Sequence, residues 1–117
     1  MSKSLSRLYQ LSSNNSEIIL NIEFGQLQRG VTTIMINDRL LINNEEGAVN
    51  ISLGNSSELK NRTLYCTSTV RPDGEDSGVT RLSYKISRGL VMLSESLEET
   101  VSGKDDIVIY TAEFFFY

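Results

Sequence analysis

The chain has 117 residues, of which 39% are hydrophobic and 22% are charged, and its formal net charge at pH 7 is −4. A chain of this length can bury roughly two thirds of its unfolded surface around one core, so we expect a single domain over residues 1–117. No stretch approaches the roughly 20 apolar residues that a membrane-spanning helix needs. The acidic balance argues against nucleic acid as a partner, because nucleic-acid binding relies on Lys and Arg that neutralise phosphates.

The first residues of the chain lack the apolar segment of a secretory signal. We therefore expect a cytoplasmic protein, with export by a route without a cleavable signal as the alternative.

Apolar side chains recur at every second position in several stretches of the sequence. The pattern is clearest over residues 17–24, and it returns in 34–36, 49–53, 64–70 and 82–86. Because successive side chains of a strand point to opposite faces, this spacing is typical of half-buried strands. The sequence predicts an all-β fold, an antiparallel β-sandwich of immunoglobulin-like or jelly-roll-like form with about eight or nine strands.

The expected strands are bounded by turn residues. They cover residues 7–12, 17–24, 31–37, 39–42, 48–53, 63–71, 79–88, 90–97 and 106–117. Turn-forming residues that begin at Pro72 predict that strands 63–71 and 79–88 form a hairpin.

Two segments have helical features. Asn55 and Glu58 have the spacing of a capping box, which predicts one helical turn near residues 56–61. In segment 90–97 the spacing of Leu90, Leu93 and Leu97 also fits one face of a helix, but glycines bound the segment and we interpret it as a strand.

In size and strand count the chain is similar to immunoglobulin-like sandwiches. It has no tryptophan and a single cysteine, so the Cys…Trp…Cys arrangement of that family is missing. The resemblance is therefore architectural and implies nothing about activity.

Residues that commonly carry catalysis or bind metals are scarce. The chain has no histidine, and Cys66 alternates with apolar residues in a way that predicts a buried thiol. We expect no enzymatic activity, no cofactor and no metal; an enzyme built on carboxylates such as Asp38 is the least favoured class. The acidic loop with Asp73, Glu75 and Asp76 could bind calcium, but a solvated hairpin tip is the favoured interpretation.

A polar row is expected on the outer face of the predicted hairpin. It contains Tyr65, Thr67, Thr69, Arg71, Arg81, Ser83 and Lys85. Such a row could contact an acidic protein or a polyhydroxylated ligand. The alternative is a solvated sheet face whose cations pair with Glu on a neighbouring strand.

The end of the chain has apolar residues on both sides of one strand. Phe114 and Phe116 share one side, and Phe115 and Tyr117 share the other. Aromatic rings are costly to leave in water, so the strand is either covered on both faces within the domain or contacts another chain. In the second case Phe114, Phe116 and Tyr117 are the candidate contact residues.

These features favour a non-enzymatic protein-interaction or structural module that associates with copies of itself or belongs to a larger assembly. The alternative is a module that binds a small ligand or a carbohydrate. Tyr65 is the one aromatic ring on the candidate polar face, which weakens that alternative.

Overall fold

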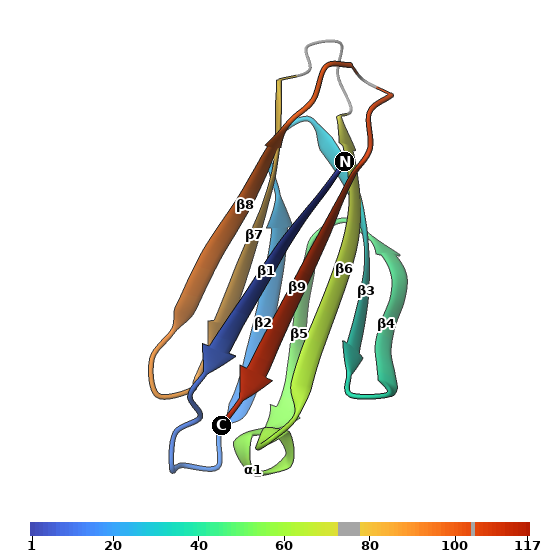
Figure 1. Ribbon diagram of the computed structural model, residues 1–117. Helices are drawn as coiled ribbons and strands as arrows, with labels where there is room; N and C mark the ends of the chain where they lie inside the picture. The colour runs from blue at the N-terminus through green and yellow to red at the C-terminus, as the bar shows by residue number, and fades with distance from the viewer. Residues whose placement is uncertain (73–77, 104) are drawn as a thin grey trace.

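The computed structural model describes residues 1–72, 78–103 and 105–117. Within these residues the chain is all-β, as predicted, with two sheets and one short helix. The strands are β1 (Ser2–Tyr9), β2 (Glu17–Phe24), β3 (Gln28–Ile36), β4 (Arg39–Glu46), β5 (Val49–Asn55), β6 (Thr63–Pro72), β7 (Val79–Ser87), β8 (Leu93–Thr100) and β9 (Val108–Phe116). The five-stranded sheet has the order β1-β9-β6-β3-β4, and the four-stranded sheet has the order β5-β2-β7-β8 (Figure 1).

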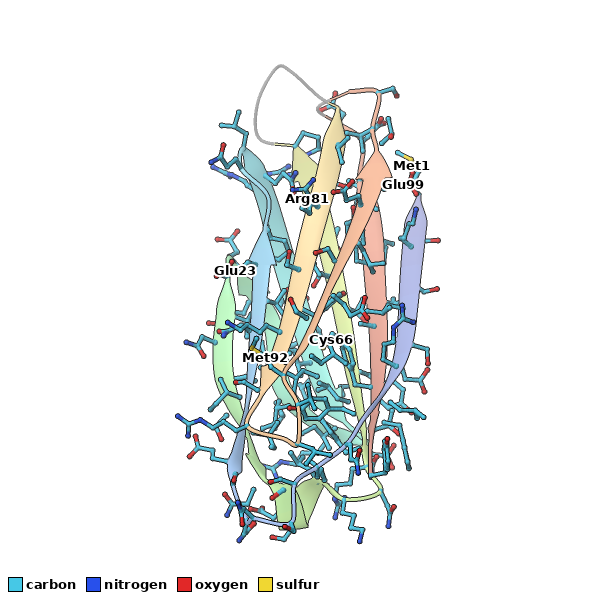
Figure 2. The ribbon with its side chains drawn as sticks, turned by 90° about the vertical axis from the view of Figure 1, so that its left-hand side faces the viewer. Met1, Glu23, Cys66, Arg81, Met92 and Glu99 are labelled. Carbon is cyan, nitrogen blue, oxygen red and sulfur yellow. The ribbon has the colours of Figure 1, made fainter. Side chains whose placement is uncertain are left out.

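The two sheets pack face to face around one hydrophobic core. Strands β6 and β9 alternate strictly between buried and exposed residues, which explains why their sequences have a period of two. Rings from the two sheets meet in the core, where Tyr84 of β7 and Phe114 of β9 contact edge to face with centroids 5.7 Å apart. Cys66 lies between the layers (Figure 2), as its position in the alternation predicted.

Strand β1 departs from the predicted antiparallel arrangement, because it runs parallel to β9. It also begins at Ser2, earlier than the expected residue 7. Its two buried residues are Leu5 and Tyr9, whereas Lys3 and Arg7 on the same side reach the edge of the other sheet. There Arg7 Nε lies 3.0 Å from a carboxylate oxygen of Glu95 on β8. Charged residues at inward positions interrupt the apolar alternation, which explains why the predicted strand over residues 7–12 overlaps β1 only at its end.

The predicted hairpin between residues 63–71 and 79–88 is wrong. Strand β6 pairs with β3 and β9, whereas β7 pairs with β2 and β8 in the other sheet. The chain therefore crosses the sandwich between β6 and β7. Residues 73–77 lie outside the described residues, and so does the acidic loop that was considered for calcium. Turn-forming residues indicate that a chain reverses, but a reversal across a sandwich uses the same residue types as one within a sheet.

Both segments with helical features have a clear outcome. Helix α1 (Ser56–Leu59) joins β5 to β6, and the Glu58 carboxylate accepts a hydrogen bond from the Asn55 N–H at 3.3 Å. Segment 90–97 is not helical: β8 begins at Leu93, and residues 90–92 belong to the turn that precedes it. Among the described residues, no helix has the length and apolar character needed to cross a membrane.

Candidate interaction surfaces

The predicted polar row is divided between the two outer faces of the sandwich. Four of its residues belong to β6 and lie on the outer face of the five-stranded sheet: Tyr65, Thr67, Thr69 and Arg71. The other three belong to β7 and lie on the outer face of the four-stranded sheet: Arg81, Ser83 and Lys85. The two groups face away from each other, because the hairpin on which the prediction depended does not form. They cannot contact one ligand together.

The three cations of this row do not form one surface, because Arg71 lies on the face opposite to Arg81 and Lys85. Arg81 Nε donates a hydrogen bond of 2.6 Å to the Glu98 carboxylate on β8, so its charge is compensated by a neighbouring strand. Lys85 lies between Asn21 and Ser94 in the register of the four-stranded sheet. Arg71 lies opposite Arg29 on β3. For Arg81, the alternative interpretation of a solvated face with paired charges fits the structure.

The aromatic residues at the end of β9 are divided as well. Phe114 and Phe116 are fully buried in the core, where Phe116 contacts Tyr9 edge to face with centroids 6.0 Å apart. They cannot form a contact surface, and for this side of the strand burial within the domain is the correct alternative. Of the three expected contact residues, only Tyr117 is exposed. Phe115, which the sequence placed on the other side of the strand, is exposed too.

Six exposed apolar side chains gather at one end of the sandwich, and a second group, which includes Leu27 and Ile107, lies at the opposite end. At the end with the six side chains, β1 and β9 terminate and the chain turns from β7 into β8 (Figure 1). Leu8 and Val91 are the most exposed members, at 66% and 71%. We call this group the apolar end; its residues are Leu8, Leu90, Val91, Met92, Phe115 and Tyr117.

The members of the apolar end lie next to one another. Leu8 and Phe115 are directly paired in the register of β1 and β9. Leu8, Val91 and Tyr117 line the same surface hollow, of about 340 Å³. Leu90 and Tyr117 line a second hollow nearby, of about 570 Å³. Strand register and the shared hollows therefore link five of these side chains, and Met92 follows Val91 in the same turn.

Hydrogen bonds hold the turn between β7 and β8 in place. The Leu90 N–H donates to the Gln10 carbonyl at 3.1 Å, and the Gly89 N–H donates to the Tyr9 hydroxyl at 2.8 Å. A Cβ atom at Gly89 would lie 2.5 Å from the Tyr9 ring, so only glycine permits this approach. The turn is thus fixed against buried Tyr9 while its three apolar side chains face solvent. Sequence analysis missed this feature because it assigned residues 90–92 to a strand.

The core contains few groups suited to chemistry. Burial raises the pKa of the Cys66 thiol to about 12, so the thiol stays protonated near neutral pH. Among the described residues, the Tyr84 hydroxyl is the one buried side-chain N or O atom without a hydrogen-bond partner. Within the same residues, no three His, Cys, Asp or Glu side chains are grouped closely enough to hold a metal ion.

No protein-family model, no curated protein and no solved structure matches the chain.

Proposed function

We propose that the protein is a non-enzymatic interaction module that associates with a second copy of itself through the apolar end. The observation that supports this proposal is the group of six large exposed apolar side chains at this end, five of which are linked by strand register or shared hollows. Single exposed apolar residues are ordinary on protein surfaces, whereas contiguous patches mark sites of interaction. Among the exposed side chains of the described residues, Leu90, Val91 and Met92 are also consecutive at the tip of a turn.

A second copy fits this surface for a reason of symmetry. A two-fold contact brings the same patch of both subunits together, so the patch must be complementary to itself. An apolar surface meets this condition without opposite charges. It also supplies the desolvated centre that stable interfaces have.

The charges around the apolar end do not oppose such a contact. Glu95, which lines one hollow of this end, is paired with Arg7 at 3.0 Å. Lys60 lines the other hollow together with Leu90 and Tyr117. Glu45 and Glu46 of β4, which contribute to the net charge of −4, line neither hollow. The charged residues that line the two hollows therefore add little repulsion to a contact between two copies.

We also propose that the sandwich is of the Greek-key type. Among the described strands, only β3–β4 and β7–β8 are sequence neighbours that also pair, so the other connections cross between the sheets. Crossing connections are typical of the Greek-key sandwiches, to which the immunoglobulin-like and jelly-roll-like forms belong. An experimentally determined structure of the dimer would test the fold class and the contact together.

The proposed self-association is tested by the double substitution Val91→Ser with Met92→Ser. Both side chains are exposed, so the variant should keep the circular-dichroism spectrum and melting temperature of the parent protein. We expect light scattering after size exclusion to give a mass above 13.1 kDa for the parent and a monomer for the variant. Val79→Ser is the matched control, because Val79 is 49% exposed at the far end of β7. A parent protein that is monomeric at high micromolar concentration would contradict the proposal, as would a control that dissociates equally.

A further inference from the structure

A second surface feature lies on the outer face of the five-stranded sheet. It is a shallow hollow of about 290 Å³ that extends over β1, β9 and β6. Leu5, Cys66 and Ala112 border it, but their side chains are buried on the other face of the sheet. We call it the hydroxyl hollow; its outward side chains are Ser4, Ser6, Tyr65, Thr67, Thr111 and Glu113.

Strand register explains the shape of the hydroxyl hollow. Ser4, Thr111 and Thr67 lie side by side across the three strands, and their short side chains form a floor. The next row contains Glu113 between Ser6 and Tyr65, so a carboxylate and an aromatic ring stand directly opposite each other. A surface with a low hydroxyl floor beside two longer side chains follows from this register.

The polar groups of the hydroxyl hollow are not used within the protein. Among the described residues, none of its six side chains makes a hydrogen bond or ion pair with another part of the chain. Polar side chains on other parts of the sheet surfaces do pair. The Asn44 N–H donates to Thr33 Oγ1 at 3.1 Å, and Arg81 donates to Glu98. The hollow thus presents five hydroxyls and one carboxylate that are available to a ligand.

We propose that the hydroxyl hollow binds one ring of a neutral saccharide. Its volume of about 290 Å³ is just below that of ordinary ligand pockets, which span roughly 300 to 1,000 Å³, so the shallow hollow can contact one ring at most. Tyr65 is 42% exposed and offers an aromatic face to the apolar side of a sugar ring. The two oxygens of Glu113 can accept hydrogen bonds from two neighbouring sugar hydroxyls, and the serine and threonine hydroxyls can donate as well as accept.

The charge of the hollow selects among saccharides. Glu113 is its one charged residue, and neither Lys nor Arg lines it. A saccharide with a carboxylate or phosphate would place a second negative charge near Glu113 without a compensating cation. A neutral sugar avoids this repulsion. Because the hollow has one aromatic ring, we expect weak binding with Kd in the millimolar range.

The hydroxyl hollow and the apolar end share no residue, but they adjoin each other, because Leu8 and Phe115 form the outward row that follows Ser6 and Glu113. The test is a nitrogen-15 NMR titration of the full chain with separate neutral hexasaccharides of glucose (α- and β-linked), mannose and N-acetylglucosamine at millimolar concentration. Oligogalacturonate serves as the anionic comparison. We expect at least one neutral oligosaccharide to shift the amide signals of Tyr65, Thr67 and Thr111, and we expect oligogalacturonate to leave them unchanged.

Substitutions at the hollow make the test specific. Tyr65→Ala and Glu113→Gln should each weaken the binding by about tenfold or more. Both side chains are exposed, so dispersed NMR spectra should show that the variants fold. Tyr117→Ala is the matched control, because it removes an exposed tyrosine at the apolar end and should leave saccharide binding unchanged.

Three results would overturn the saccharide site: no shift with any neutral oligosaccharide, equal binding of oligogalacturonate, or unchanged binding by Tyr65→Ala. The two proposals can also fail separately. Tyr65→Ala should leave the mass of the assembly unchanged, and Val91→Ser with Met92→Ser should leave saccharide binding unchanged.

Discussion

Phe115 and Phe116 are adjacent in β9, yet their rings lie on opposite sides of the five-stranded sheet. Phe116 is fully buried and contacts Tyr9 edge to face. Phe115 is 36% exposed and lies beside Leu8 of β1. Because side chains alternate along a strand, one short aromatic segment contributes both to the core and to the apolar end.

This division predicts different effects of the same substitution at neighbouring positions. Phe116→Ser should lower the free energy of unfolding by about 3–5 kcal/mol or prevent folding, because it leaves a cavity and a hydroxyl in the core. Phe115→Ser should lower it by less than about 1.5 kcal/mol, since much of its ring is already in water. Urea denaturation followed by circular dichroism measures both. Equal losses at the two positions would contradict the placement of these rings.

Gly30, near the start of β3, tests the packing against Phe24, and Gly103 serves as the comparison. A Cβ atom at Gly30 would lie 2.3 Å from the Phe24 ring, whereas one at Gly103 would have nothing within 4 Å. We expect Gly30→Ala to destabilise the protein by roughly 1–3 kcal/mol through overpacking. Gly103→Ala should change stability by less than about 0.5 kcal/mol. Thermal denaturation of the two variants gives the comparison, and a neutral Gly30→Ala would show that Phe24 packs elsewhere.

The sequence located strands best where one face of the strand is buried and the other is exposed to solvent. In β2, β6 and β9 the apolar alternation located each strand to within a few residues, because burial on one face imposes a period of two. The capping spacing of Asn55 and Glu58 likewise located α1, since it depends on neighbours in the chain.

The sequence was least informative where a feature depends on partners far along the chain. The pairing of β6 with β3 and β9 instead of β7 cannot be read from a turn. The edge strand β1 was recognised only in part, because Lys3 and Arg7 occupy inward positions that reach the other sheet. For the same reason the hydroxyl hollow was missed: it arises when Ser4, Thr111 and Thr67 come into one row.

Two buried tyrosines should respond in opposite ways when their hydroxyls are removed. The Tyr84 hydroxyl is buried without a partner, whereas the Tyr110 hydroxyl donates to the Thr80 carbonyl at 2.9 Å. Tyr84→Phe removes an unsatisfied polar atom and should leave stability unchanged or raise it by about 1 kcal/mol. Tyr110→Phe leaves buried partners without a donor and should cost roughly 1–3 kcal/mol. Chemical denaturation provides the measurement, and a larger loss for Tyr84→Phe would reveal a partner for its hydroxyl.

Stability should fall as the pH rises above about 9, because burial raises the pKa of Cys66 from 9.0 to about 12. Burial also raises the pKa values of Tyr84 and Tyr110 above 10.0. Between the unfolded and folded values, the unfolded chain loses protons that the folded chain retains, so ionisation favours unfolding. The stabilisation from these groups is therefore complete below pH 9 and is lost progressively above it.

Urea midpoints measured from pH 8 upward would follow this loss. Cys66→Ala should weaken the pH dependence, although the variant is less stable overall because of the cavity that it leaves. The same burial predicts that the Cys66 thiol of the folded protein reacts with an aromatic disulfide reagent far more slowly than the thiol in urea. Equal reaction rates at pH 8 in the folded and unfolded states would contradict the position of Cys66 between the sheets, because a buried protonated thiol can react only when the sandwich opens.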